Sequence, residues 1–273
     1  MTRILFRLFR MRLVLMNSIA AFGGYLLYPG KAEVIQVAAL CGGVSLLACA
    51  GSALNQVMER DLDCLMERTK NRPLPQGDLT PSTAAGLGAV CLLAGLALLL
   101  AGGGLTPALL GAAALFWYLA VYTPLKRRTP FALALGALSG ALAPVIGWSF
   151  AGGSPVDFRV ILLSGVLYLW QMPHFWLLQR RHADDYRRAG FPLFAPSAKG
   201  RGPAPVLVLW MLAMIAGALM LPAFGMIGRP AAPWCAAFCA PLIVACFRRC
   251  EPALFACLNL FPLLVTLALC AGR

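Results

Sequence analysis

The chain has 273 residues, of which 60% are hydrophobic and 12% are charged, a composition typical of a membrane protein with several spans. Soluble globular folds are thereby excluded, and so is nucleic acid as a partner, because the bases behind the formal charge of +13 are dispersed among short segments between apolar stretches. The ten cysteines include no C-x-x-C pair, which predicts buried apolar side chains and argues against a disulfide framework or a cysteine metal site.

Nine apolar stretches are long enough to cross a lipid bilayer, which requires about 20 residues of helix. In chain order they lie near residues 13–29, 34–54, 83–101, 105–122, 131–150, 159–178, 205–223, 231–247 and 253–271. Glycine and proline inside these stretches are tolerated in membrane helices, where small residues permit close packing. The sequence therefore predicts an all-α membrane protein with nine transmembrane helices, in a single domain over residues 1–273.

The basic residues indicate the orientation in the membrane. With the N-terminus in the cytoplasm, most of them fall in cytoplasmic segments; the exceptions are Lys31, Arg159, Arg229 and Arg273. This positive-inside bias predicts a cytoplasmic N-terminus and a C-terminus outside. We interpret the N-terminal arginines, from Arg3 to Arg12, as topology signals. They run directly into the first span with no convincing cleavable targeting peptide, so we expect a bacterial inner (plasma) membrane, with the active site toward the cytoplasm.

The segment between the second and third spans concentrates four acids and four bases beside the membrane, over residues 55–75. Polar groups near hydrocarbon are costly unless they are solvated, paired or bound to an ion. The alternative interpretation is a set of solvated turns with local salt bridges. The position of so much charge in a hydrophobic chain favours an active site.

Apolar residues at helical spacing predict that the second span continues as a helix through this segment. Asn55, Glu59 and Asp63 then follow at i, i+4 and i+8 on one ridge, with Glu67 next along it and Asp61 on another face. Amide and carboxylate oxygens on one ridge are a suitable partial shell for Mg²⁺, which completes its coordination with water and substrate phosphate. The arrangement suits metal-bridged binding of a diphosphate.

The charged segment resembles a known family. The spacing from Asn55 to Asp63, followed by Arg68-Thr-x-x-Arg72-Pro-Leu, is similar to the signature of the UbiA superfamily of intramembrane prenyltransferases, which also have nine transmembrane helices. Glu59 stands where the superfamily often has Asp, which lengthens the side chain but keeps the carboxylate.

Three later blocks resemble the protoheme IX farnesyltransferase branch of this superfamily. They are Tyr122-Thr-Pro-Leu-Lys126-Arg127, Trp170-Gln171-Met-Pro-His174-Phe175 and Asp184-Asp185-Tyr186. Ala132 and Ala143 replace an expected Asn and Pro. The resemblance covers roughly residues 50–195, and the last three spans match only in hydrophobicity.

The resemblance implies transfer of a farnesyl group from farnesyl diphosphate to a vinyl group of heme B, with addition of water, giving heme O and diphosphate. Acids of the second and sixth helix regions would hold Mg²⁺ and the diphosphate between them. The implied catalytic residues are Asn55, Glu59, Asp63, Lys126, His174 and Asp185; the metal ligands are Asn55, Glu59, Asp63 and Asp185; the substrate-binding residues are Asp61, Arg68, Arg72, Tyr122, Arg127, Gln171 and Tyr186.

Several alternatives stay open at this level. His174 could position the porphyrin, ligate its iron or handle the proton and water steps. The acceptor could be a quinone precursor or chlorophyllide, and a non-catalytic heme-binding or transport protein is a further alternative. A heme A synthase is a candidate partner that would receive the product, but the sequence does not decide this.

Overall fold

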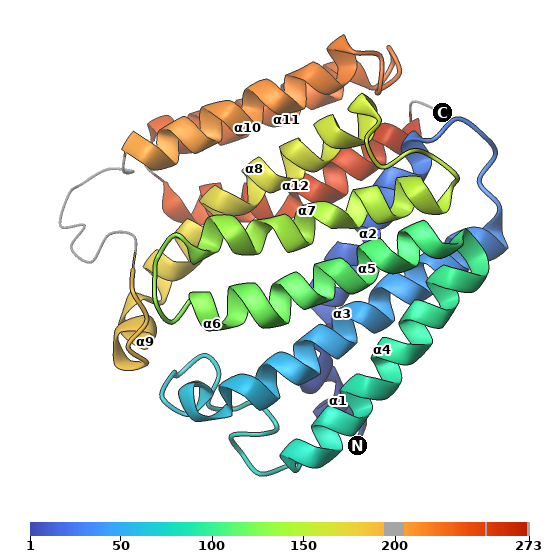
Figure 1. Cartoon of the computed structure of the whole chain (residues 1–273). Helices are drawn as coiled ribbons and strands as arrows, with labels where there is room; N and C mark the ends of the chain where they lie inside the picture. Colours follow the sequence, from blue (N-terminus) through green and yellow to red (C-terminus); the bar gives the residue numbers. More distant parts are fainter. Residues whose placement is uncertain (194–204, 249, 272–273) are drawn as a thin grey trace.

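The computed structural model describes residues 1–193, 205–248 and 250–271, which form helices and connecting turns with no strand among them (Figure 1). The helices are α1 (Thr2–Phe9), α2 (Met11–Leu27), α3 (Val34–Asp63), α4 (Pro81–Gly103), α5 (Leu105–Phe116), the π-helical η1 (Trp117–Tyr122), α6 (Thr123–Leu125), α7 (Ala132–Phe150), α8 (Phe158–Arg181), α9 (Ala183–Arg188), α10 (Pro205–Ala223), α11 (Ala232–Phe247) and α12 (Glu251–Ala271).

Seven helices in the described ranges are long and apolar enough to cross a membrane. They are α3, α4, the continuous helix Leu105–Leu125, α7, α8, residues Val206–Ala223 of α10, and α12. Large apolar side chains lie exposed along them, for example Leu93, Leu209 and Leu267, as expected of a surface that faces lipid. Seven of the predicted spans are thus confirmed. The other two coincide with shorter apolar helices, α2 and the Ala232–Ala245 part of α11, so the total of nine stays a prediction.

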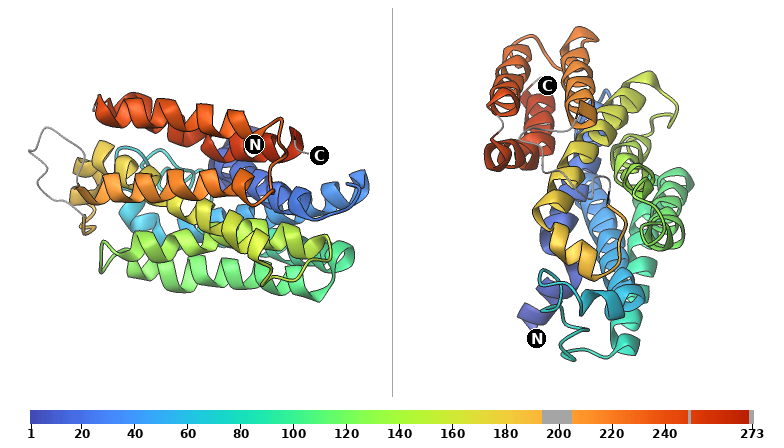
Figure 2. Two further views of the ribbon diagram at one scale, coloured as in Figure 1. Left: turned by 90° about the horizontal axis from the view of Figure 1, so that it is seen from above. Right: turned by 90° about the vertical axis from the view of Figure 1, so that its left-hand side faces the viewer.

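The helices pack side by side as one bundle (Figure 2). α10, α11 and α12 gather at one side and α3, α4 and α5 at the opposite side, while α2 packs against α3, α7 and α12. Thr266 of α12 donates to the backbone oxygen of Ile19 in α2 at 3.4 Å, so the first and last apolar helices of the chain lie together. α2 is therefore a central element that contacts both halves of the bundle.

Small residues allow the close approach of α2 and α7. A Cβ atom added to Gly24 would lie 1.9 Å from the backbone oxygen of Pro144, and one added to Gly147 would lie 1.8 Å from that of Ala21. Only glycine permits this backbone contact, which is the packing mode expected where van der Waals contact drives helix association in lipid.

The prediction that the cysteines are buried holds for only some of them. Cys49 and Cys239 are buried, whereas Cys64, Cys250 and Cys270 are exposed, the first two because they lie in turns at helix ends. The side chains of Cys235 and Cys246 lie outside the described part.

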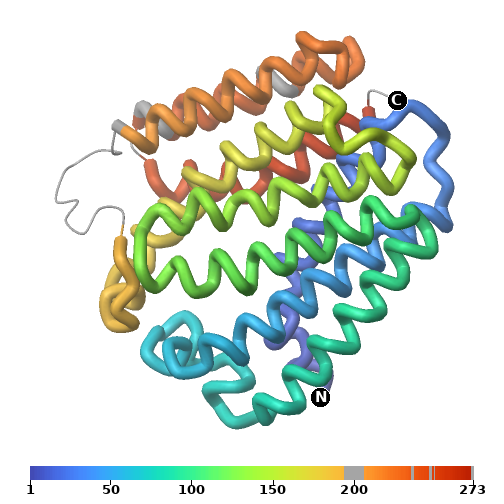
Figure 3. Tube along the Cα trace, viewed as in Figure 1, coloured from blue at the N-terminus to red at the C-terminus, as the bar shows by residue number. Residues whose placement is uncertain are grey.

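The turns that follow α3, α6 and α8 meet at one end of the bundle, where the Cα trace shows the 64–80 segment beside α9 (Figure 3). Met66 packs there against Phe191 and Ala189. Arg127 donates to the backbone oxygen of Met58 at 2.8 Å and so joins the turn after α6 to α3. These contacts bring three charged segments, distant in sequence, together at one end of the bundle.

Candidate active site

A cavity of about 760 Å³ lies inside this end of the bundle, between α2, α3, η1, α7 and α8. The ridge predicted on α3 faces it. Asn55, Glu59 and Asp63 line the cavity and are at most 3% exposed. Asp61 is exposed and does not line it, as its different helical face predicts. Glu67 is a correction: it is exposed and off the ridge, because α3 ends at Asp63 and the chain continues in turns.

Both carboxylates of the ridge are paired with bases. Lys126 Nζ lies 2.5 Å from Glu59 Oε2, and Arg72 Nη1 donates to both carboxylate oxygens of Asp63, at 2.8 and 2.6 Å. Asn55 is oriented by its amide, which donates to Thr123 Oγ1 at 3.2 Å. The acids of α3 are thereby held in place by two bases, Arg72 and Lys126, that the resemblance also assigns to the site.

Burial lowers the pKa of Lys126 and of Arg72 from their ordinary values, although the adjacent Glu59 and Asp63 oppose the change. Because both bases are already desolvated, they lose few water contacts when an anionic ligand binds. The site therefore favours exchange of the carboxylate partner of each base for an oxygen of the ligand.

Asp185 is buried but does not line the cavity. Its carboxylate accepts hydrogen bonds from the backbone N–H groups of Glu67 and Arg68, at 3.1 and 3.0 Å, and pairs with Arg188. Burial opposes ionisation, yet these donors together lower the pKa of Asp185. In the structure Asp185 therefore fixes the turn that carries Arg68, and its predicted role as a metal ligand stays a prediction.

The predicted substrate-binding residues divide into two groups. Arg68, Arg72, Tyr122, Gln171 and Tyr186 line the cavity, whereas Asp61 and Arg127 do not. Ala132 and Ala143, which stand for an expected Asn and Pro, are both buried in the cavity wall on α7.

The π-helical turn η1 presents two aromatic rings to the cavity. Tyr118 and Tyr122 stack with ring centroids 5.7 Å apart and both line it. A π-helix widens the turn and is often found at functional sites. The ring of Tyr122 fills the space beside Gly136, where a Cβ atom would lie 2.5 Å from it.

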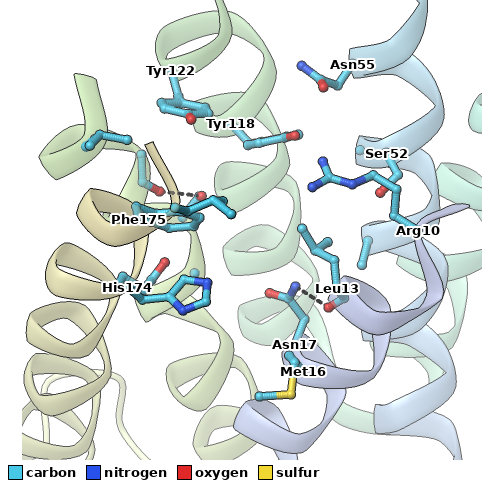
Figure 4. A pocket seen from close by; sticks show the side chains of 18 of the residues that line it. Arg10, Leu13, Met16, Asn17, Ser52, Asn55, Tyr118, Tyr122, His174 and Phe175 are labelled. Atoms are coloured by element: carbon cyan, nitrogen blue, oxygen red, sulfur yellow. Dashed lines mark hydrogen bonds between the residues drawn. The ribbon is translucent and has the colours of Figure 1, made fainter. Parts of the chain in front are cut away.

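His174 lies deeper in the cavity, on α8 (Figure 4). Its ring stacks on Trp170 and on Phe255, with centroids 5.2 and 5.3 Å away. Its Nδ1 atom is buried and has no hydrogen-bond partner among the described residues. Gln171 is fixed by its amide, which donates to the backbone oxygens of Ala137 and Leu167. The structure therefore holds the imidazole of His174 by ring stacking and leaves its buried Nδ1 atom without a partner in the described part of the chain.

Sequence reasoning gave no site role to several polar side chains of the cavity wall, among them Arg10, Asn17 and Ser52. Asn17 could have been found as an isolated amide within an apolar span. The other two carried no usable signal, because an arginine in a basic N-terminal run indicates topology and a lone serine is ordinary in a membrane helix.

The donor set fits a hard divalent cation. In the described ranges no three His, Cys, Asp or Glu side chains converge as a ready-made metal cluster. Glu59 Oε1, however, is buried with no hydrogen-bond partner in the described part of the chain, and it lies on the same ridge as Asp63 and Asn55. Oxygen ligands that leave positions for water and phosphate are the ligands that Mg²⁺ prefers.

The fold and the cavity define an intramembrane prenyltransferase, and the chain belongs to the UbiA prenyltransferase family, whose model matches residues 17–271. Its similarity extends to relatives named protoheme IX farnesyltransferase. The relative from Geobacter sulfurreducens is 60% identical, and the match covers 98% of this chain and 99% of the relative. The relative from Oleidesulfovibrio alaskensis is 43% identical, and the match covers 82% of this chain and 79% of the relative.

Solved structures share the fold. A UbiA homologue from Aeropyrum pernix K1 has a TM-score of 0.76, is 22% identical, and covers 95% of this chain and 96% of its own. A homologue from Archaeoglobus fulgidus bound to GPP and Mg²⁺ has a TM-score of 0.75 and 18% identity, and covers 98% of both chains. The resemblance predicted from the sequence motifs is therefore confirmed, and the chain is a multi-pass membrane protein.

Proposed function

We propose that this chain transfers the farnesyl group of farnesyl diphosphate to a vinyl group of heme B, with addition of water at the vinyl group, giving heme O and diphosphate. The observation that carries the proposal is the convergence of two halves on one cavity. The acid ridge with its bases suits the donor, and His174 between aromatic rings suits a porphyrin. The relatives named protoheme IX farnesyltransferase support the same donor and acceptor.

The donor is expected at the cytoplasmic end of the cavity. Mg²⁺ held by Asn55, Glu59 and Asp63 would neutralise charge that develops on the leaving diphosphate. Lys126 and Arg72, which are paired with the acids of the ridge in the structure, would exchange these partners for phosphate oxygens. The protein thus keeps its bases oriented until the donor binds.

The farnesyl chain extends into the apolar part of the cavity. When the bond between C1 and the diphosphate oxygen breaks, its electron pair leaves with the diphosphate and an allylic cation remains. The faces of Tyr118 and Tyr122 are suited to stabilise that cation, because aromatic faces carry negative charge density. The apolar wall excludes water until the vinyl group attacks C1.

The acceptor is expected to lie against His174. The unpartnered Nδ1 atom and the stacked rings of Trp170 and Phe255 favour either a nitrogen donor toward the porphyrin iron or a ring that positions the porphyrin.

We further propose nine transmembrane helices in one domain, a cytoplasmic N-terminus, and a bacterial inner membrane with the cavity opening toward the cytoplasm. The basic residues of the cytoplasmic segments support this orientation.

The test is direct. Purified full-length protein in lipid nanodiscs receives heme B, farnesyl diphosphate and MgCl₂, and mass spectrometry follows heme O. We expect heme O to form, and its formation to stop when EDTA removes the divalent cation and to resume when Mg²⁺ is restored. Prenylation of 4-hydroxybenzoate or chlorophyllide without any heme O would refute the choice of acceptor.

A further inference from the structure

Arg10 occupies an unusual bend between α1 and α2. Its backbone has φ 54° and ψ 58°, the only positive φ of a non-glycine residue in the described ranges. The left-handed conformation costs roughly 1–2 kcal/mol for a residue with a side chain, so the surrounding structure must enforce it. Gln56 of α3 holds the residues just before this bend. Its amide donates to the backbone oxygens of Arg7 and Leu8 and fixes the end of α1.

The bend gives Arg10 a different environment from its neighbours. Arg3 is exposed and does not line the cavity; Arg7 and Arg12 do line it, but Arg12 is exposed and Arg7 pairs with Asp78 at 3.5 Å. Arg10 instead projects into the cavity beside Ser52 and toward Tyr118 (Figure 4). A strained backbone at an arginine whose side chain enters the cavity indicates a function for that side chain.

Arg10 is also unpaired. Arg72 and Lys126 each contact a carboxylate, but Arg10 has no ion pair with any residue in the described part of the chain. Ser52, at 2% exposure, lines the same wall, and its buried hydroxyl has no hydrogen-bond partner there either. A free guanidinium and a free hydroxyl on one wall form a pair of donors without an acceptor.

The charge balance identifies the kind of acceptor. Glu59 and Asp63 balance Lys126 and Arg72, and Asp78 pairs with Arg7, so the charges of Arg10, Arg12 and Arg68 are in excess among the residues that line the cavity. The charge of Arg10 acts on the acid ridge and its bases, since it contributes to lowering the pKa of both Lys126 and Arg72. A diphosphate ester carries more negative charge than one Mg²⁺ neutralises, and a further guanidinium compensates for the remainder.

We propose that Arg10 and Ser52 form an oxyanion subsite that binds a phosphate group of the prenyl donor, one helical turn from Asn55. The proposal rests on the proposed function of this cavity. The carboxylates of heme are the other oxyanions that could enter, but they lie on the porphyrin edge away from the vinyl groups and hence away from the donor's C1. The guanidinium fork of Arg10 can contact two phosphate oxygens at once.

The subsite acts on the leaving group. As the C1–oxygen bond breaks, negative charge grows on the diphosphate, and Arg10 is already oriented toward it by the backbone bend. A donor that is positioned before the reaction needs no reorganisation when the charge appears. The structure thus links α1, through Gln56, to binding of the donor.

The experiment compares Arg10→Gln, Arg10→Lys and Ser52→Ala with Arg3→Gln, an exposed arginine of α1, in full-length protein. The readout is the Ki of inorganic pyrophosphate with Mg²⁺, measured by displacement of radiolabelled farnesyl diphosphate, which needs no acceptor. We expect Arg10→Gln to raise this Ki roughly tenfold or more, the usual effect of losing hydrogen bonds to a charged group. Arg10→Lys should recover part of it, Ser52→Ala should show a smaller rise, and Arg3→Gln should leave it unchanged.

Heme B affinity, measured by absorbance titration, should stay constant in all four variants. An unchanged pyrophosphate Ki in Arg10→Gln would overturn the proposal. If the Ki is unchanged and the heme affinity falls, Arg10 binds the porphyrin carboxylates. An equal effect in Arg3→Gln would also overturn it, as a general effect of surface charge. Because displacement requires no heme O, failure of the subsite is distinguishable from failure of the proposed reaction.

Discussion

Replacing Asp63 by Asn tests whether the end of α3 is catalytic or only structural. The Asp63 side chain is fully buried and accepts two hydrogen bonds from Arg72, while its backbone oxygen accepts one from Thr69. Asn keeps the size and one acceptor oxygen but loses the charge. Hydrogen bonds to charged groups contribute about 1.5–3 kcal/mol, and Arg72 is 13% exposed toward the cavity, so we expect a loss of about 2 kcal/mol in stability.

Arg72→Gln is the matched control, because it breaks the same ion pair from the other side and keeps the carboxylate. Both variants should lower the melting temperature of the purified protein by a similar amount. If Asp63 holds Mg²⁺, only Asp63→Asn should also lose at least about a hundredfold in kcat, the usual effect of removing one group that stabilises developing charge. Arg72→Gln should raise the KM for farnesyl diphosphate and leave the dependence on Mg²⁺ concentration unchanged.

The assay measures heme O by mass spectrometry over a series of Mg²⁺ concentrations, with melting temperatures taken on the same samples. The reasoning fails if the two variants lose the same activity and stability at every Mg²⁺ concentration. Asp63 would then act only as the anchor of Arg72.

Three further changes test other parts of the site and fold. Lys126→Ala leaves the buried carboxylate of Glu59 without its counter-charge, and we expect the KM for farnesyl diphosphate to rise at least roughly tenfold in initial-rate assays; an unchanged KM would exclude Lys126 from donor binding. His174→Phe keeps an aromatic ring but removes the unpartnered nitrogen, so formation of heme O should be lost while displacement assays show intact donor binding. If the variant with bound heme has the same absorption spectrum as the wild type, His174 does not ligate the iron. Gly147→Ala forces α2 and α7 apart and should lower the melting temperature, since overpacking typically costs about 1–3 kcal/mol of stability. The control Gly165→Ala, with open space around the added methyl group, should leave the melting temperature unchanged. Equal melting temperatures of the two variants would contradict the close contact of α2 and α7.

Hydrophobicity and motif spacing were sufficient for most of the architecture. Seven spans were found because about 20 consecutive apolar residues have few alternatives to a membrane helix. α2 and α11, with 17 and 16 residues, are shorter than these seven, so length and composition alone do not establish them as spans. The ridge of Asn55, Glu59 and Asp63 followed from helical geometry alone, and the position of Glu67 did not, because the end of α3 is set by contacts of the following turn with α9.

Asp185 is a second residue whose position the sequence did not predict. Its sequence block identified the family, yet its side chain contacts the backbone of the 64–68 turn and not the cavity, a long-range contact that no spacing predicts.

The sequence by itself determined that this chain is an all-helical membrane protein of the UbiA prenyltransferase family, with an acid ridge and a porphyrin-type block, because periodicity and motifs are local properties. Only the tertiary structure decided which bases pair with which acids, and that Arg10 lines the cavity without an ion pair in the described part of the chain. The physical reason is that these contacts join residues distant in sequence: Gln56, nearly fifty residues away, holds the end of α1 against α3 just before the bend at Arg10.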